Sequence, residues 1–458
     1  MILETVIDTG DTAWVLISAA LVFLMTPGLA FFYGGMVRAK GVLNMMMMSF
    51  ISIGTIGTLW ILFGFSIAFG EDVGGGWLGN PFQFFGLNGL LGEGATFGSA
   101  PDVIPALAFV GFQAAFAIIA TALVSGAIAD RASFGGWTLF TIFWGILVYF
   151  PAAHWVFDFA GLTDDAGATT QVGGWIANLG VYDFAGGTAI HINAGASALA
   201  LALVLGPRIG FGSKPMRPHN LTAVMLGAAL LWFGWFGFNA GSAVAGNGLA
   251  AFAWVNTLGA TCAAMIGWLI VEKLRDGHPT SLGAASGIVA GLVAITPSCS
   301  TVEPWAALVI GLVAGVVCAF AVGLKYKLGY DDSLDVVGVH LVGGLIGTLL
   351  IGFFASPNAP GIGDGVGLFY GGGLEQLGKQ AVGALFVMCY GFLVSCAIAF
   401  VIKKTIGWRV SPAVELDGID RAEHSEIGYD LSPVYYTSRV QRTLVMTKEE
   451  LEDVPAAK

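Results

Sequence analysis

Residues 184–205 read FAGGTAIHINAGASALALALVL, a stretch in which nearly every side chain is apolar or small. Its single ionisable side chain is His191. A helix needs about 20 apolar residues to cross the hydrocarbon core of a bilayer. A strand of a membrane barrel would instead alternate polar and apolar residues over about ten positions. The stretch therefore predicts a membrane-spanning helix that carries one histidine.

Ten other stretches share this apolar character, and the composition of the whole chain agrees with it. Of the 458 residues, 56% are hydrophobic and 11% are charged, whereas a soluble chain is about half apolar and about a quarter charged. We expect an all-α integral membrane protein with eleven transmembrane helices, of which the eighth is short. In chain order the predicted spans are Trp14–Met36, Leu43–Phe69, Ile104–Ile128, Phe134–Trp155, Phe184–Leu205, Leu221–Ala243, Leu249–Val271, Leu282–Ile295, Trp305–Leu324, Val336–Phe354 and Gln380–Ile402.

The positive charges alternate between the two ends of these spans. Of the 19 Lys and Arg residues, only Lys379 falls outside a set made of every second connection and the segment after the last span. The positive-inside rule makes that set cytoplasmic, so we expect the N-terminus outside and the C-terminus inside. The outer connections are acidic, which reflects either the lack of Lys and Arg there or a weak attraction for cations. Their acidic residues are Glu71, Asp72, Glu93, Asp102, Asp158, Asp164, Asp165 and Asp364.

Several other classes of function are disfavoured by the sequence. The net charge of −11 offers no basic surface for nucleic acid. The five Cys residues form no CxxC pair, so we expect them to be packing residues rather than a metal or redox centre. The spans carry no set of nucleophile, base and acid at a consistent depth, and no phosphate-binding loop. We therefore expect neither an enzyme nor a bound cofactor or metal.

The two halves of the chain resemble each other weakly. His191 lies within the fifth predicted span and His340 within the tenth, and Asp183 and Asp335 precede them. Five spans repeated as five place the halves in opposite orientations across the membrane, as in many transporters. The predicted halves of this inverted repeat are residues 13–205 and 221–354, and an eleventh helix at 380–402 lies outside it.

Only two of the six His residues, His191 and His340, lie well inside predicted spans. Ionisable residues at that depth are costly and usually face a cavity or each other. Small residues flank both, which lets helices approach closely. Two separate His residues bonded to backbone carbonyls are the alternative, but the symmetric placement favours a functional pair.

The chemistry of a buried His pair suits a small polar molecule. Two ligands are too few for zinc, which takes three or four from the protein. One ring nitrogen donates a hydrogen bond while the other accepts, so a pair can relay a proton or pass a molecule that does both. A bare cation gains much less, because its desolvation costs tens of kcal/mol on the Born estimate.

Aromatic residues and one carboxylate complete the candidates. Phe116 lies in the third span, and Phe238 lies four residues before Ser242 near the outer end of the sixth. An aromatic face attracts a cation by about 0.5 to 2 kcal/mol, although plain core packing is equally compatible with this composition. Asp183 begins the fifth span, where we favour a helix-capping role over direct binding of a cation.

Five strings of this sequence form a recognisable pattern. They are TPGLAFFYGG at 26–35, FQAAF at 112–116, DFAGGTAIHIN at 183–193, GWFGFNAGS at 234–242 and DVVGVH at 335–340. Together they resemble the ammonium transporter family (Amt/MEP/Rh), and its Amt branch most. The tail string DGID at 417–420, with His424 and Tyr429 after it, is similar to the cytoplasmic tail motif of that family.

The resemblance implies a homotrimer in which residues 1–402 of each subunit form a bundle with its own pore. It implies that residues 403–458 are a cytoplasmic regulatory tail and that a PII-type signal protein is the regulator. It also implies a role for each matched residue. Ammonium would bind in an outer vestibule at Ser242 and Phe116, pass a gate of Phe116 and Phe238, and meet His191 and His340 in the pore, with Asp183 supporting the binding site.

One position departs from the family pattern. Where many bacterial members carry a vestibule Trp, this chain has Phe157, and Trp155 lies two residues earlier, where a helix turns it elsewhere. Phe is a weaker cation–π partner than Trp. We place Phe157 in the ammonium-binding vestibule with Ser242 and Phe116.

The expected function is ammonium uptake across the cytoplasmic membrane, with methylammonium as a possible second substrate. Ammonium would lose its proton near the gate, ammonia would cross the pore, and the proton would move separately, so that net transport is electrogenic. An ammonium sensor that signals through its tail, and an electroneutral ammonia or gas channel of the Rh kind, are the alternatives. The tail of about 56 residues resembles no kinase or receiver domain, which favours transport.

Overall fold

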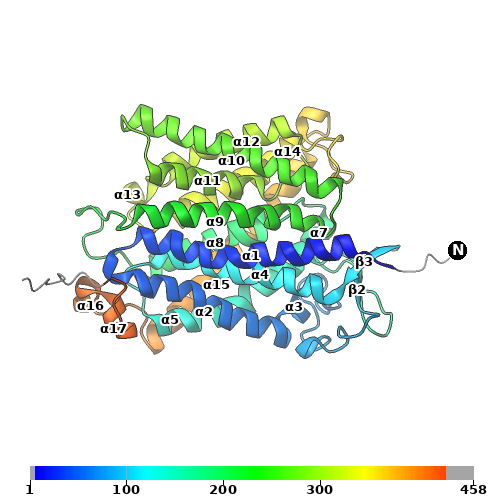
Figure 1. Cartoon of the computed structure of the whole chain (residues 1–458), viewed down its shortest axis with the longest axis horizontal. Coiled ribbons are helices and arrows are strands. Elements are labelled where there is room, and N and C mark those ends of the chain that lie inside the picture. The colour runs from blue at the N-terminus through cyan, green and yellow to red at the C-terminus, as the bar shows by residue number, and fades with distance from the viewer. Residues whose placement is uncertain (1–5, 100, 430–458) are drawn as a thin grey trace, which may run out of the picture.

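The computed structural model describes residues 6–99 and 101–429. Most of its helices run along one long axis of the molecule (Figure 1). Of the predicted regulatory tail, 430–458 lies outside the described residues.

Ten helical segments in the described part are long and apolar enough to cross a bilayer. The eighth predicted span is α11 (Ser281–Ile295), whose 15 residues are shorter than a full crossing. Eleven transmembrane helices therefore remain a prediction, while the all-helical membrane architecture is confirmed. The ten segments are α1 (Thr9–Met36), η1 to α3 (Ala39–Phe69), α4 with η4 (Ala106–Ile128), α5 to α6 (Phe134–Phe157), η6 with α8 (Gly187–Leu205), α9 with η7 (Leu221–Ala243), α10 (Gly248–Arg275), α12 with α13 (Pro304–Leu328), η8 with α14 (Val337–Phe354) and α15 (Glu375–Thr405).

Several of these segments are composite, because a regular α-helix is joined to a turn of π-helix. π-Turns are rare and occur often at functional positions. Both intramembrane His residues lie in such turns, His191 in η6 and His340 in η8. The π-turns are η2 (Trp60–Gly64), η5 (Gly145–Tyr149), η6 (Gly187–Ile192) and η8 (Val337–Leu341). The α-helices joined to them are α2 (Val42–Leu59), α3 (Phe65–Phe69), α5 (Phe134–Trp144), α6 (Phe150–Phe157), α8 (Asn193–Leu205) and α14 (Val342–Phe354).

Glycine allows the first helices of the two predicted halves, α1 and α9, to lie against each other. A Cβ atom at Gly227 of α9 would overlap the backbone of Phe32 in α1. One at Gly35 of α1 would lie 2.6 Å from the carbonyl oxygen of Asn220, which precedes α9. Small residues of this kind are what bring membrane helices into close contact.

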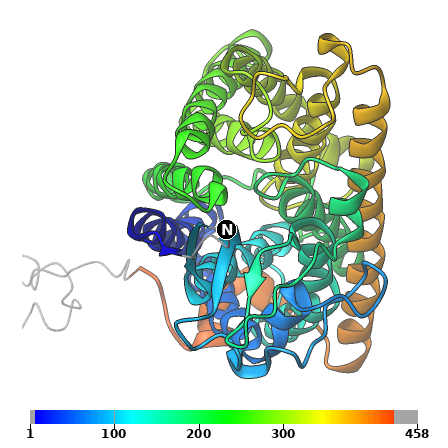
Figure 2. The same ribbon diagram turned by 90° about the vertical axis from the view of Figure 1, so that its right-hand side faces the viewer.

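The long helix α15 joins the two predicted halves on one flank. It packs against α5 and α8 from the first half and against α14 from the second. Figure 2, which looks along most of the helices, shows α15 lengthwise and therefore steeply inclined to them. This helix corresponds to the eleventh predicted span, outside the proposed repeat.

The two ends of the bundle carry different structures (Figure 1). One end, which we call the sheet face, carries a four-stranded sheet of order β1-β3-β2-β4 that the sequence analysis did not predict. In it β1 runs parallel to β3, and the other pairs are antiparallel. The opposite end, the tail face, carries α16 (Pro412–Asp417) and α17 (Ile419–His424). The strands are β1 (Val6–Ile7), β2 (Thr96–Ser99), β3 (Asp102–Pro105) and β4 (Leu162–Thr163).

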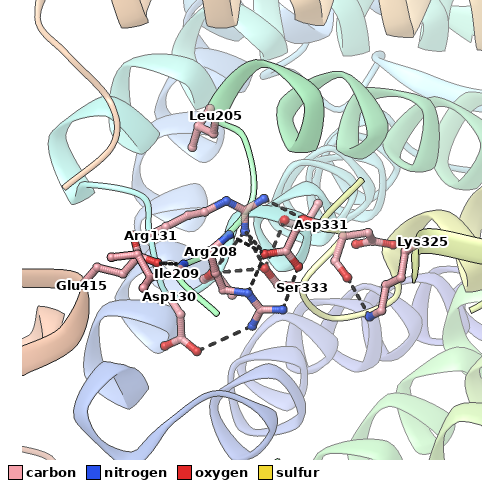
Figure 3. Close-up of polar contacts among 12 residues, drawn as sticks. Asp130, Arg131, Leu205, Arg208, Ile209, Lys325, Asp331, Ser333 and Glu415 are labelled. Atoms are coloured by element: carbon pink, nitrogen blue, oxygen red, sulfur yellow. Dashed lines mark hydrogen bonds and ion pairs between the residues drawn. The ribbon is translucent and has the colours of Figure 1, made fainter. Parts of the chain in front are cut away.

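At the tail face, buried ion pairs join connections that are far apart in the sequence (Figure 3). Arg208 donates to both carboxylate oxygens of Asp331, at 2.9 and 2.8 Å, and Arg131 donates to the carbonyl oxygen of Asp331 at 2.7 Å. Burial raises the pKa of the Asp331 carboxyl, but the hydrogen bonds and charge of Arg208 outweigh burial and lower it. The loops after α4, α8 and α13 are thereby tied together.

The described part of the tail is fastened to the same loops. Glu415 accepts hydrogen bonds from the backbone N–H of Ile209 at 2.6 Å and from Arg409 at 2.7 Å. Asp420 accepts from the backbone N–H groups of Leu43 and Asn44, at 3.0 and 2.8 Å, where α2 begins. A carboxylate at a helix N-terminus is favourable because of the free N–H groups there.

Candidate functional site

A cavity of about 380 Å³ enters the molecule from the sheet face. It brings together three of the predicted residues, Ser242, Phe116 and Phe157. The hydroxyl of Ser242 donates to the carbonyl oxygen of Phe238 at 2.8 Å, so its lone pairs remain available as acceptors. The cavity therefore offers a hydroxyl acceptor and aromatic rings to a ligand that donates hydrogen bonds.

Two stacked rings lie between this cavity and the histidines: Phe116 lines the cavity, and Phe238 stacks on His191. The centroids of Phe116 and Phe238 lie 4.3 Å apart with the ring planes at 28°. Each side chain is only 1% exposed, and Phe112 packs its edge against Phe116 at 4.8 Å. The stacked pair separates the cavity from the two intramembrane His residues.

The two His residues contact each other directly. The Nδ1 atoms of His191 and His340 lie 3.3 Å apart, and the ring planes are inclined at 31°. One Nδ1 must donate and the other must accept, so the two rings carry different tautomers when both are neutral. The Nε2 atom of His191 has no hydrogen-bond partner among the described residues. The pair thus has unused hydrogen-bonding capacity in a buried place.

The close approach of the rings follows from a glycine on each helix. Gly195 lies four residues after His191, and a Cβ there would overlap Leu341. Gly344 lies four residues after His340, and a Cβ there would lie 3.3 Å from the Cβ of His191. The small residues noted in the sequence therefore let the two helices cross at the histidines.

Asp183 caps the helix that carries His191. Its carboxylate accepts hydrogen bonds from the backbone N–H groups of Gly186 at 3.0 Å and Ala189 at 3.2 Å, and from the hydroxyl of Thr188. It also accepts from two further N–H groups in the same turn. These contacts match the capping role that the sequence favoured over direct binding of a cation.

The counterpart of Asp183 in the second half is Asp332 and not Asp335. Asp332 lies eight residues before His340, as Asp183 lies eight before His191. Its carboxylate accepts from the backbone N–H groups four and five residues ahead, at 3.1 and 2.7 Å, as that of Asp183 does. Asp335 instead contacts Lys325 at 2.6 Å. The sequence analysis paired Asp183 with Asp335, the Asp nearest to His340, and this pairing was wrong. Three acidic residues, Asp331, Asp332 and Asp335, lie within five positions of that loop, so the sequence alone did not distinguish them.

Trp235 lies directly against His191, and no role was predicted for it from the sequence. The two rings stack with centroids 5.3 Å apart and planes at 23°, and Phe238 stacks on the same His at 6.0 Å. The indole N–H of Trp235 donates to the hydroxyl of Thr296 at 2.9 Å. Trp235 lies three residues before Phe238, so the two side chains share one face of the helix. This spacing was the sequence signal that could have identified Trp235.

Narrow apolar spaces continue from the His pair toward the tail face. Two cavities of about 10 Å³ each have His340 in their walls, and such a volume is near the minimum for a single water molecule. Among the described residues the first is lined, apart from the two His, by Met, Leu, Phe, Ile, Trp and Val side chains. The second includes Tyr33, Ser286 and Asp335 at its wall.

Trp155 and Phe157 point to different places, as the sequence analysis expected. Phe157 is 5% exposed and lines the cavity. Trp155 donates its indole N–H to the carbonyl oxygen of Trp77 at 2.8 Å and packs against Tyr390, with ring centroids 4.8 Å apart. The cavity wall at this position therefore carries a phenyl ring.

Within residues 6–99 and 101–429, no three His, Cys, Asp or Glu side chains are arranged to bind a metal ion. The predicted residues that meet here offer hydroxyl, imidazole and aromatic groups. It suits a small ligand that donates hydrogen bonds and is attracted by ring faces.

Comparison with known proteins identifies similar sequences and structures over nearly the whole chain. The sequence model of the Ammonium Transporter Family matches residues 13–429. A protein of Mycobacterium tuberculosis (strain ATCC 25618 / H37Rv) named Ammonium transporter is 58% identical over 441 residues, covering 93% of this chain and 91% of the relative.

Two solved structures share the architecture. The crystal structure of Saccharomyces cerevisiae Mep2 has a TM-score of 0.81 and 32% sequence identity, covering 94% of this chain and 93% of that one. A structure named Sensor Amt Protein has a TM-score of 0.81 and 30% identity, covering 91% of this chain and 98% of that one.

Proposed function

The chain belongs to the Ammonium Transporter Family and is integral to the cytoplasmic membrane, and on this premise we propose that it takes up ammonium through a pore lined by the two histidines. The observation that carries the proposal is the contact between His191 and His340, 3.3 Å apart at Nδ1. The pair lies between an open polar cavity and a narrow apolar passage.

Recruitment takes place in the cavity at the sheet face, which we assign to the outside of the cell. An ammonium ion donates to the free lone pairs of Ser242 and lies against the rings of Phe116 and Phe157. Each such ring contributes about 0.5 to 2 kcal/mol. Asp183 supports this arrangement from the cap of the His191 helix.

Selection follows at the gate, where the ion loses a proton. Ammonium and potassium have similar charge and size, so attraction alone cannot separate them, but only ammonium can become neutral. Beyond Phe116 and Phe238 the first narrow cavity is lined by apolar side chains apart from the His pair, and the second also has Tyr33, Ser286 and Asp335 at its wall. Ammonia passes along the imidazoles, and the proton crosses separately by a path that involves them, so that net transport is electrogenic.

The assembly and regulation that we propose follow the family. Three copies form a homotrimer, each with its own pore, and the tail from residue 403 is a cytoplasmic regulatory segment to which a PII-type signal protein binds. The contacts of Glu415 and Asp420 with inner loops support a tail that senses the state of those loops. The alternating Lys and Arg residues support the tail face as the cytoplasmic one.

Electrophysiology on a solid-supported membrane tests the transport proposal. Proteoliposomes that contain the full chain are pulsed with ammonium, methylammonium and potassium at matched ionic strength. We expect a current on ammonium, a smaller one on methylammonium and none on potassium. Ammonium-driven internal alkalinisation without current would support the electroneutral alternative and contradict the electrogenic proposal.

A sensor is the second candidate, because a Sensor Amt Protein is among the structural neighbours at 30% identity. It would bind ammonium in the same cavity and report through the tail without useful flux. Saturable ammonium binding in the absence of both current and pH change would favour this role over transport.

A further inference from the structure

The cavity at the sheet face extends well beyond Ser242 and the two rings. Its volume of about 380 Å³ exceeds many times the roughly 30 Å³ that one water molecule occupies in the liquid. One dehydrated ammonium ion at Ser242 would fill only a small part of it. The remaining space is lined by groups to which the proposed mechanism gives no role.

Among residues 6–99 and 101–429, the only charged side chains that line this cavity are the carboxylates of Asp11 and Asp102. Asp102 begins β3 and is exposed, and its carboxylate makes no hydrogen bond or ion pair with the described residues. Asp11, in the first turn of α1, is held by the backbone N–H of Gly246 at 2.8 Å. With no Lys or Arg in the lining, the charge of these carboxylates is not neutralised within the cavity.

A buried amide in the same cavity also lacks a partner. Gln113 is 9% exposed, lies three residues before Phe116 on α4, and lines the cavity. Its Oε1 atom is without a hydrogen-bond partner among the described residues. An unsatisfied buried acceptor costs about 1 to 3 kcal/mol, so its presence indicates a ligand that donates hydrogen bonds.

We propose that Asp11, Asp102 and Gln113 form an outer cation station, which holds a hydrated monovalent cation before it reaches Ser242. The inference rests on the proposed ammonium uptake and adds a binding step before it. Carboxylate and amide oxygens attract any monovalent cation that keeps its water. The station therefore accepts potassium and rubidium as well as ammonium, and selection begins only at the gate.

Competition between cations tests the station in wild-type protein and in Asp102→Asn. Ammonium currents are recorded with added potassium or with an equal concentration of N-methyl-D-glucamine. We expect potassium to raise the ammonium concentration for half-maximal current in wild type, and to do so much less in Asp102→Asn. The substitution alone raises that concentration about threefold at low salt, because one nearby charge is lost.

Asp364→Asn is the matched control, since Asp364 is exposed and does not line the cavity. It removes the same charge and should behave as wild type in the competition. Gln113→Leu, which keeps the bulk of the side chain, should weaken ammonium binding in the same direction as Asp102→Asn. Equal behaviour of Asp102→Asn and Asp364→Asn would overturn the proposal.

A second readout needs no transport and separates the station from the transport proposal. Rubidium should raise the thermal unfolding midpoint of wild type and Asp364→Asn relative to N-methyl-D-glucamine, but not that of Asp102→Asn. Wild-type protein without ammonium current but with this rubidium effect would refute uptake and support the station. An ammonium current combined with no rubidium effect in wild type would support uptake and refute the station.

Discussion

The segments around His191 and His340 have the same plan but different surroundings. Each His lies in a π-turn, eight residues after a capping Asp and four before a close-contact Gly. Asp183 receives four backbone N–H groups and one hydroxyl from a single turn. Asp332 receives two N–H groups and lies beside the Lys325–Asp335 ion pair.

This difference distinguishes the two ends of the bundle. At the sheet face the charged groups that line the cavity are acidic and unpaired with bases, which suits attraction of a cation. At the tail face the carboxylates are paired with Arg208, Arg131 and Lys325, which fixes loops and tail. The two segments therefore hold similar His residues in surroundings of different charge.

The largest expected effects come from removing the two capping carboxylates, Asp183 and Asp332. Asp183→Ala leaves four N–H groups without an acceptor and should destabilise the fold by about 4 kcal/mol, at about 1 kcal/mol each. Asp332→Ala leaves two and should cost about 2 kcal/mol. Thermal unfolding in detergent should show the larger drop in midpoint for Asp183→Ala.

Asp335→Ala is the control for this prediction. It removes a partly exposed carboxylate that caps no helix, and the buried Lys325 keeps its hydrogen bond to the carbonyl oxygen of Asp332, so it should cost less than Asp332→Ala. A larger loss for Asp335→Ala than for Asp332→Ala would contradict the structural equivalence of Asp183 and Asp332.

A more moderate effect is expected at the vestibule wall. Phe157→Trp places a stronger cation–π partner against the ammonium ion and should lower the ammonium concentration for half-maximal current about threefold. Trp155→Phe is the matched change outside the cavity and should leave that concentration unaltered. No change, or a weaker apparent affinity, in Phe157→Trp would count against a ring at 157 that faces the ion.

A further effect depends on pH and differs between the two ends of the bundle. Burial, with the nearby charges of Asp72 and Glu71, raises the pKa of Asp158 at the sheet face from 3.8 to about 8. The folded state therefore holds an extra proton between about pH 4 and pH 8, and stability falls as pH rises through that window. Asp331 has a lowered pKa, so its contribution is complete above about pH 4 and is lost only as pH falls through that lowered pKa.

Unfolding midpoints of wild type and Asp158→Asn between pH 5 and pH 9 check this sign. Wild type should lose about 4 °C over the range relative to the variant, because about 3 pH units at about 1.4 kcal/mol each give about 4 kcal/mol and a chain of this length loses about 1 °C per kcal/mol. Asp331→Asn should lower the midpoint without changing its slope in that range. Parallel curves for wild type and Asp158→Asn would show that Asp158 does not retain its proton in the fold.

Most of the membrane-spanning helices could be predicted because a segment that crosses the lipid must be a long run of apolar residues. All ten long segments coincide with predicted spans to within several residues. The contact of His191 and His340 was also within reach, since two rare buried residues at matched places in a repeat have few partners available.

The remaining features depend on tertiary contacts that no local pattern carries. The four-stranded sheet is built from strands of two to four residues in loops, too short for a period of two to stand out. Asp332 was overlooked because Asp331 and Asp335 are its neighbours in sequence. Trp235 was one of 13 Trp residues, and only its stacking on His191 distinguishes it.

The central claim is that two imidazoles in a dry passage admit ammonia and exclude bare cations, and His191→Asp tests it most directly. On a solid-supported membrane, potassium pulses should evoke a current in this variant and none in wild type, because a carboxylate in the passage stabilises a cation. His278→Asp, at an exposed position, should behave as wild type. An unchanged ammonium current with continued exclusion of potassium in His191→Asp would contradict the account.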